Sequence, residues 1–431
     1  MPRPPILFAA ITHTAVYETG EGTMDYYLLT HLAADMGYQL AMAGAETFRV
    51  EDTMRRILQA YGVTCQTFAI PNCVAVSIEA ANGKPLMVMK RVGYHGNDLE
   101  KMEQMNALSR RICTERPEPE TARQWMKEAV RRCRTYHTAV YYLGNLLAGL
   151  GFCIVFGGTL RDAAWAGFMG LVIGFVNRFT AQREVNPFFS TIIAAFLMAL
   201  PAYLAAGLGW LDNPNAANIG ALMILVPGLL ITNSMRDIIY GDTNSGMVRI
   251  VQVILSAMAI ALGTAAAWHL TASVYGQTTA ETVSWSAGAQ AAAVFVGCWG
   301  FTILFNVHGR GSVLCVLAGA ATWMVYLLCT ALGLGVYSAN MFAAIFAAVC
   351  AEIMARLRKC PVTPYLVIAV VPLLPGAGVY YTMSMGLEGD LIEALRKGLE
   401  TAGIAGSLAV GILLTSTVFR LLVRRQHPSE G

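Results

Sequence analysis

A short pattern occurs twice in this 431-residue chain, each time inside an apolar segment long enough to cross a membrane. The first copy runs from Pro227-Gly228 to Gly241-Asp242, and the second runs from Pro375-Gly376 to Gly389-Asp390. In both copies twelve residues separate the Pro-Gly pair from the Gly-Asp pair. Proline removes a backbone donor from a helix, and lipid cannot satisfy the carbonyl that this frees. Each Pro-Gly pair therefore predicts a helix break that faces protein or water within the membrane.

Charge is distributed unevenly along the chain. Apolar residues make up 56% of the sequence and charged residues only 13%, and the mean hydropathy is +0.52. This balance is typical of a membrane protein with many spans. Ordinary amounts of charge occur only before about residue 135, which predicts a small cytoplasmic α+β domain over 24–135. Residues 1–23 are interpreted as a leader, with a signal peptide as the alternative, because the apolar run from Ile6 to Val16 is short and is interrupted by polar residues.

Local patterns give the expected elements of that domain. Helical periodicity covers Asp25–Ala60, Asn97–Cys113 and Pro119–Arg134, and β-branched residues are frequent in Val63–Ile78 and Pro85–Val92. Asn82-Gly83 separates the two β-rich stretches, and this dipeptide predicts a hairpin turn.

Beyond Thr138 the apolar blocks predict ten membrane spans. They cover 138–160, 162–181, 187–209, 215–235, 247–271, 286–306, 312–335, 337–357, 362–384 and 400–422. Basic residues concentrate on one set of flanks, and the positive-inside rule makes those flanks cytoplasmic. The cytoplasmic flanks hold Arg131, Arg132, Arg134, Arg178, Arg183, Arg236, Arg249, Arg310, Arg356, Arg358, Lys359, Arg420, Arg424 and Arg425, whereas the outer loops hold Arg161, Arg396 and Lys397. Both termini are therefore expected in the cytoplasm.

Ten spans divide into two sets of five, over 136–272 and 283–425, with a polar loop between them. Because five is odd, the second set enters the membrane in the opposite direction. The Pro-Gly copies fall in the fourth span of each set. Paired interruptions in inverted repeats are typical of the binding site of a secondary transporter.

Candidate substrate-binding residues cluster at the two breaks. Helix breaks expose amides that attract a carboxylate, and carbonyls that attract an ammonium group, which together suit a zwitterion. The alternative is that the breaks are only kinks, and that the neighbouring hydroxyl groups bond their own helices. The candidates are Pro227, Gly228, Thr232, Asn233 and Ser234 at the first break, and Pro375, Gly376, Tyr380, Tyr381 and Thr382 at the second.

Carboxylates near membrane depth are few, and Asp237, Asp242 and Glu352 are the candidates for ion coupling. Each also has a purely structural interpretation. Arg236 and Asp237 could pair with each other in the interface, and Glu352 could pair with Arg356 one turn away. In the soluble domain, Glu46, Arg49, Glu51 and Asp52 are interpreted as a solvated helix face, with a regulatory or hydrolytic site as the alternative.

Other chemistry has little support in the sequence. The ten cysteines show no CxxC pair and no metal-ligand spacing, so neither a disulfide framework nor a metal site is expected. Nucleotide-binding loops, dinucleotide fingerprints and GxSxG motifs do not occur in the sequence. No catalytic residue and no cofactor is assigned, and transport energy is expected to come from a gradient.

The sequence resembles the threonine/serine exporter family over nearly its whole length. The resemblance rests on Gly44-Ala-Glu46, on Arg49-Val-Glu51, on Leu225–Arg249, on Gly300–Asn306 and on Val370–Tyr381. The resemblance implies that this chain is the form of the family in which both membrane parts are fused in one chain. It also implies a location in a bacterial inner membrane and coupling of transport to protons. Two-gene members of the family are associated with export of succinate-like dicarboxylates.

The sequence and the resemblance together predict a secondary exporter of threonine and serine, an antiporter of solute and protons, and not an enzyme. The expected partners are the solute, protons and the lipid bilayer, with a homo-oligomer left open and no nucleic acid. A dicarboxylate exporter of the same fold is the first alternative, although only Arg178, Arg236 and Arg356 offer cations near the bundle. A membrane sensor or a membrane-anchored enzyme, either one using the soluble domain, is the alternative of another class.

Overall fold

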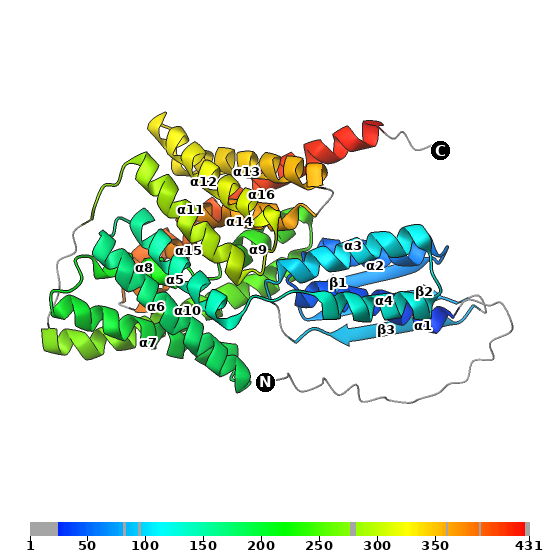
Figure 1. The fold of residues 1–431 in the computed structure, drawn as a ribbon, viewed down its shortest axis with the longest axis horizontal. Coiled ribbons are helices and arrows are strands. Elements are labelled where there is room, and N and C mark those ends of the chain that lie inside the picture. The colour runs from blue at the N-terminus through cyan, green and yellow to red at the C-terminus, as the bar shows by residue number, and fades with distance from the viewer. Residues whose placement is uncertain are drawn as a thin grey trace.

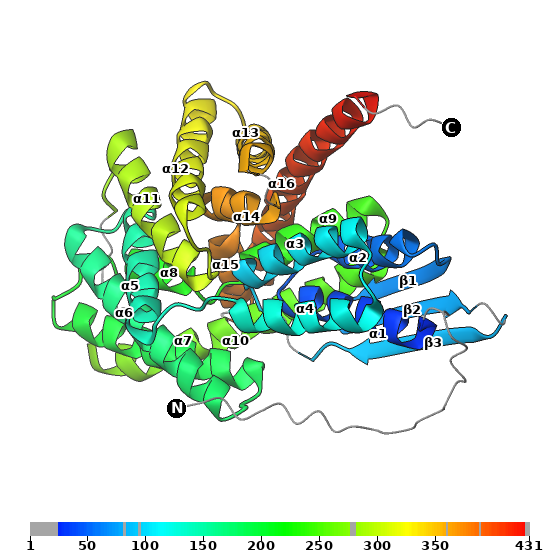
Figure 2. The ribbon, with the colours of Figure 1, turned by 45° about the vertical axis from the view of Figure 1, so that its right-hand side comes forward.

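The protein consists of a small domain of helices and strands beside a larger helical bundle (Figures 1 and 2). The computed structural model describes residues 25–80, 83–93, 96–275, 282–358, 361–387 and 389–426. The predicted leader over 1–23 lies outside these residues. The two parts lie side by side, and α9 (Gly228–Tyr240) lies at their junction in both views.

The N-terminal domain is a three-stranded antiparallel sheet with helices packed on it. Strand β1 (Cys65–Ile70) pairs with β2 (Cys73–Glu79), and β2 pairs with β3 (Pro85–Arg91) with Glu79 opposite Pro85. The predicted hairpin between β2 and β3 is therefore confirmed, although Asn82 itself lies outside the described residues. The single stretch predicted over Val63–Ile78 holds two strands. The helices are α1 (Tyr26–Met42), α2 (Thr47–Ala60), α3 (Leu99–Glu115) and α4 (Pro119–Arg132).

The helical stretch predicted over Asp25–Ala60 is two helices, so the prediction of continuous helix is wrong there. The chain turns between α1 and α2, where Gly44 has a φ of +87° that side chains rarely adopt. A Cβ on Gly44 would also lie 2.2 Å from the Gly96 carbonyl oxygen. The periodicity continues through both helices because both bury apolar faces in the same core. The turn brings the start of α2 to the bundle.

The bundle contains eight helices that are long and apolar enough to cross a membrane, within the described residues. They are α5 (Thr138–Val155), α6 (Leu160–Gln182), α7 (Pro187–Gly207), α10 (Thr243–Tyr275), α11 (Ala287–Leu304), α12 (Arg310–Ala331), α13 (Val336–Arg358) and α16 (Leu391–Gln426). Each of the eight overlaps one predicted span. The chain is thus a multi-pass membrane protein.

The two remaining predicted spans are broken at the duplicated pattern. The first consists of α8 (Pro214–Leu222) and α9, which are separated by five residues. The second consists of α14 (Thr363–Val370), a short 3₁₀ turn (Val371–Leu373) and α15 (Gly376–Leu387), with a bend of 49°. Counted as one broken span, this bent pair is a ninth within the described residues. The span predicted over 215–235 is thus interrupted at the Pro-Gly pair, and the backbone leaves the helix after Leu222, before Pro227 is reached.

The Gly-Asp half of the pattern forms a tight corner between two helices. Gly241 ends α9 with a φ of +94°, and Gly389 follows α15 with a φ of +93°. The carboxylate of Asp242 accepts a hydrogen bond from the Ser245 amide (3.3 Å) and caps α10, as Asp390 caps α16. Glycine supplies the left-handed residue and aspartate supplies the cap. The long helices α10 and α16 therefore begin directly after these corners.

Candidate functional site

The two Pro-Gly breaks contact each other in the interior of the bundle. A Cβ on Gly228 would lie 2.9 Å from Leu374 Cβ, and a Cβ on Gly376 would lie 2.8 Å from Val226 Cγ1. Val226 and Leu374 occupy the same place in the two copies of the pattern, so the contacts are reciprocal. The N-terminal ends of α9 and α15 therefore meet at one place, and the first amides of a helix lack partners within the helix.

A cavity of about 530 Å³, which we call the break cavity, lies against this meeting point. Pro227 and Gly228 line it together with Leu229 and Leu230, so the first turn of α9 opens into it. Asn233 on α9 and Gln252 and Ser256 on α10 add polar side chains. Arg249 is the single charged lining residue within the described part of the chain.

Four of the ten candidate substrate residues line the break cavity: Pro227, Gly228, Asn233 and Gly376. The hydroxyl groups of Thr232, Ser234 and Thr382 instead donate to backbone carbonyls, at 3.2, 2.8 and 2.7 Å. For Thr232 and Thr382 the acceptor is their own helix, one turn earlier, as in the structural alternative. Pro375, Tyr380 and Tyr381 are not among the lining residues, and the two tyrosine rings pack at 5.5 Å between centroids.

Gln252 and Ser256 were not among the residues predicted from the sequence. They are four residues apart and therefore lie on one face of α10. Two uncharged polar side chains at this spacing in an apolar span are the pattern that could have identified them. Neither side chain, nor that of Asn233, has a hydrogen-bond partner among the residues that the structure describes.

A larger cavity of about 950 Å³, which we call the charged vestibule, lies between the N-terminal domain and the bundle. Six carboxylates and six guanidinium groups line it, and they come from α2, α3, α9, α13, α16 and neighbouring turns. The carboxylates are Glu46, Glu51, Asp52, Asp237, Asp242 and Glu352, and the guanidinium groups are Arg49, Arg56, Arg110, Arg236, Arg356 and Arg420. The three candidate ion-coupling carboxylates are thus gathered in one cavity.

Two buried ion pairs form what we call the ion-pair cluster: Glu46 with Arg236, and Asp237 with Arg249. The Asp237 Oδ2 to Arg249 Nε distance is 2.9 Å, and the four side chains are only 10–20% exposed. Arg236 and Asp237 do not pair with each other, contrary to the structural alternative. The solvated-face interpretation is wrong for Glu46, because the turn at Gly44 points the start of α2 into the bundle.

Electrostatics favour the charged form of Glu46. Burial acts to raise the pKa of this carboxyl, but the guanidinium groups of Arg236 and Arg49 outweigh burial and hold the pKa below its usual value. Glu352 and Asp242, the two coupling candidates outside the ion-pair cluster, have weaker partners than Asp237. Glu352 accepts from Arg356 at 3.4 Å, as the structural alternative expected, and Asp242 caps α10.

The N-terminal domain is also fixed to the second half of the bundle. The Leu99 amide donates to the Phe305 carbonyl (3.0 Å), and the Asn306 side-chain amide donates to Asp98 (2.9 Å). The Tyr136 hydroxyl donates to the Val307 carbonyl (2.7 Å). Asn306 therefore joins the turn after α11 to the start of α3.

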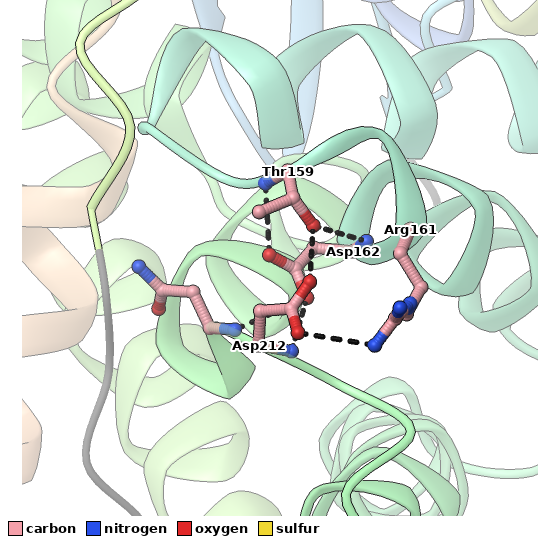
Figure 3. Close-up of polar contacts among 5 residues, drawn as sticks. Thr159, Arg161, Asp162 and Asp212 are labelled. Atoms are coloured by element: carbon pink, nitrogen blue, oxygen red, sulfur yellow. Dashed lines mark hydrogen bonds and ion pairs between the residues drawn. The ribbon is translucent and has the colours of Figure 1, made fainter.

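A buried carboxylate holds two turns together at the other end of the bundle. Asp162, at the start of α6, accepts hydrogen bonds from the amides of Thr159 (2.8 Å), Asp212 (2.8 Å) and Asn213 (3.1 Å), as Figure 3 shows. Arg161 and the Thr159 hydroxyl both bond Asp212. The side chain of Asp162 is fully buried, so these bonds compensate for its lost hydration. They tie the α5–α6 turn to the chain between α7 and α8.

Comparisons with known proteins decide the family. A family model described as a putative threonine/serine exporter matches residues 31–271, which is more than half of the chain, and a second, described as a threonine/serine exporter, matches residues 290–418. The chain belongs to the threonine/serine exporter family. Among curated relatives of this family member, the threonine/serine exporter of Corynebacterium glutamicum is 24% identical over 91% of this chain and 83% of its own.

Two further relatives differ in how much they cover. The probable threonine/serine exporter of Mycobacterium tuberculosis is 23% identical over 90% of this chain and 76% of its own. The probable succinate transporter subunit YjjP of Escherichia coli is 22% identical over 54% of this chain and 91% of its own. No solved structure matches this member of the family.

Proposed function

We propose that this exporter-family member carries threonine and serine out of the cell by alternating access, with the substrate bound in the break cavity. The observation that carries the proposal is the opening of the first turn of α9 into a polar cavity beside the second break. The Gly228 amide already donates to the Val226 carbonyl (2.9 Å), so the Leu229 and Leu230 amides and the positive end of that helix are the groups that suit a substrate carboxylate. Asn233, Gln252 and Ser256 suit the ammonium and hydroxyl groups.

We further propose that the bundle is two inverted five-helix repeats, with each broken helix counted as one span. The reciprocal contacts of Gly228 with Leu374 and of Gly376 with Val226 support this arrangement. So does the crossing of α5 and α11: a Cβ on Gly151 would meet Ala293, and a Cβ on Gly300 would meet Gly144. The two contacts are equivalent, because Gly300 lies 149 residues after Gly151 and Ala293 lies 149 residues after Gly144. Two-fold related halves give two equivalent conformations, which is the basis of alternating access.

The proposed orientation places the N-terminal domain and the C-terminus in the cytoplasm of a bacterial cell, with the spans in the inner membrane. The bias of basic residues supports it. A reporter fused after Gly431 should be cytoplasmic, and a cysteine at Thr278 should react with an impermeant reagent from outside only. Labelling at 278 from the cytoplasmic side would overturn the ten-span topology.

A dicarboxylate substrate is the second candidate, and the partial match to a probable succinate transporter subunit favours it. Two carboxylates need more than one cation in the site. Arg249, the charged residue at the break cavity, is already paired with Asp237. Counterflow of labelled threonine, serine and succinate in vesicles separates the candidates. Succinate counterflow without threonine counterflow would overturn the amino-acid assignment.

Proton coupling is proposed for one of Asp237, Asp242 and Glu352, which all line the charged vestibule. If one of them cycles a proton, its replacement by the neutral amide should abolish gradient-driven export. Exchange at equal concentrations should partly survive, because exchange moves no net proton. Wild-type uphill export by all three amide variants would mean that the carrier is a different group.

A further inference from the structure

The ion-pair cluster forms the partition between the two cavities. Arg249 lines the break cavity, whereas its partner Asp237 lines the charged vestibule. Consecutive residues of the N-terminal domain divide in the same way, with Ala45 at the break cavity and Glu46 at the vestibule. The direct path from the vestibule to the paired breaks therefore runs through this cluster.

The partition includes a residue of the N-terminal domain. Glu46 comes from the start of α2, and Thr47 beside it contacts Arg249 at 3.5 Å. The rings of Phe48 and Tyr240 stack next to the cluster at 5.8 Å between centroids. Thus α2 contacts the first half of the bundle, while the start of α3 is hydrogen-bonded to the second half through Asn306 and Phe305. Movement of one half against the other must separate α2 from α9 or break the bonds at α3.

Charge balance indicates what can open the partition. Removing one partner from a buried ion pair is costly because the other charge is left uncompensated. A zwitterion lowers this cost for the two groups on α9: its carboxylate can replace Glu46 at Arg236, and its ammonium group can replace Arg249 at Asp237. The displaced Glu46 and Arg249 each line a cavity. Guanidinium and carboxylate groups match in geometry as well as in charge. A dicarboxylate could also replace Glu46 at Arg236, but its second carboxylate would bring negative charge against Asp237 instead of replacing Arg249 there.

We propose that the ion-pair cluster is the inner gate of the protein and a transit site for zwitterionic amino acids, with the N-terminal domain supplying one of the four gate residues. The zwitterionic selectivity rests on the proposed function. The barrier role of the cluster does not depend on it. The proposal also gives the N-terminal domain a role, since among the described residues Glu46 is the ion-pair partner of Arg236.

The barrier is tested by access to the break cavity. A cysteine is introduced by Ser256→Cys in the full-length protein, and its reaction with an impermeant maleimide from the side of the N-terminal domain is followed by peptide mass spectrometry. Adding Glu46→Gln should raise the labelling rate by about tenfold or more. The loss of one partner of a buried ion pair destabilises the closed state by enough to account for a change of this size. The exchange Glu46→Arg with Arg236→Glu restores the pair and should return the rate toward that of the parent.

Asp52→Asn is the matched control, because Asp52 is also a vestibule carboxylate on α2 but pairs with Arg56 (2.7 Å) outside the cluster. It should leave labelling at 256 unchanged. Equal labelling of the Glu46→Gln and Asp52→Asn variants would overturn the barrier role. If Glu46→Gln reduces the folded yield, the charge-exchange variant still decides: a tenfold rise despite the restored pair contradicts the proposal.

The selectivity is tested by the separation of α2 from α9. Cysteines introduced by Phe48→Cys and Tyr240→Cys are joined with a short bifunctional thiol reagent, and the linked peptides are quantified. Threonine should slow cross-linking several-fold, and succinate should not. Equal effects of the two solutes would overturn the zwitterionic transit site. A failure of threonine counterflow would instead contradict the proposed function. It would not affect the conclusion about the barrier that is drawn from labelling at position 256.

Discussion

Helices α5 and α11 cross so closely at Gly300 that even its substitution by alanine should lower the stability of the protein. A Cβ on Gly300 would lie 2.4 Å from the Ala148 backbone nitrogen and 2.6 Å from the Gly144 carbonyl oxygen. Ordinary contacts begin near 3.4 Å, so the Gly300→Ala variant must move the two helices apart by about 1 Å. The obstacles are backbone atoms, which cannot rotate away as a side chain can.

The magnitude follows from two opposing effects. Overpacking of a close contact costs about 1–3 kcal/mol, and a clash with backbone belongs at the upper end. Alanine in place of glycine gains up to about 1 kcal/mol in helix propensity. The net loss should be about 2 kcal/mol. Since small residues let membrane helices approach closely, the loss should come from the separation of α5 and α11.

The assay compares Gly300→Ala with Gly288→Ala on the same helix. A Cβ on Gly288 would meet nothing within 4 Å, so that variant should be neutral or slightly more stable. Purified protein in detergent is heated at a fixed rate, and the fraction that remains monodisperse gives an apparent melting temperature. Gly300→Ala should melt a few degrees lower, and Gly151→Ala should match it. Equal melting of the 300 and 288 variants would refute the reasoning.

Three other predictions concern the breaks, the N-terminal domain and the turns that Asp162 joins. Pro227→Ala and Pro375→Ala should each fold but lose transport, since each restores a backbone donor that can close the break; normal binding and flux in both would make the breaks mere kinks. Burial raises the pKa of Glu51, so its charged form costs stability: the folded state is favoured below the unfolded pKa, and this benefit is lost as pH rises through the raised pKa. Glu51→Gln should therefore raise the apparent melting temperature at pH 7.5 and lose this advantage at pH 4, and an equal advantage at both pH values would contradict this. Asp162→Asn places amide hydrogens against backbone donors and should cost about 1–3 kcal/mol, whereas Asp212→Asn, at a half-exposed position, should cost less in the same thermal assay.

The sequence predicted most spans because their apolar blocks are long and clearly bounded. It also predicted where the two broken helices would be interrupted, since proline and glycine act on the local backbone. It could not predict that Gly228 and Gly376 would pack against each other's preceding residues. That contact depends on how the halves are arranged, and no local pattern encodes it.

Polar residues were harder to assign than apolar ones. Thr232 and Asn233 are neighbours with similar polarity, but one bonds its own helix and the other lines the break cavity, because successive residues of a helix point about 100° apart. Glu46 carries the pattern of a solvated helix face, and only the position of the N-terminal domain shows that its partner is Arg236. Helical spacing could have identified Gln252 and Ser256, had the polar residues of each span been compared at intervals of four.

The Gly-Asp corners have a mechanical consequence. Each corner joins a short helix at the break to a long helix of 33 or 36 residues, α10 or α16. Within each pair the helices pack closely: a Cβ on Gly246 would lie 2.4 Å from Ile238, and a Cβ on Gly378 would lie 2.3 Å from Thr401. Each pair should therefore move as one rigid arm. At 1.5 Å per residue the longer member measures about 50 Å, so a tilt of about 10° at the corner displaces its far end by about 9 Å. A solute smaller than one helical turn could in this way reposition an entire face of the protein.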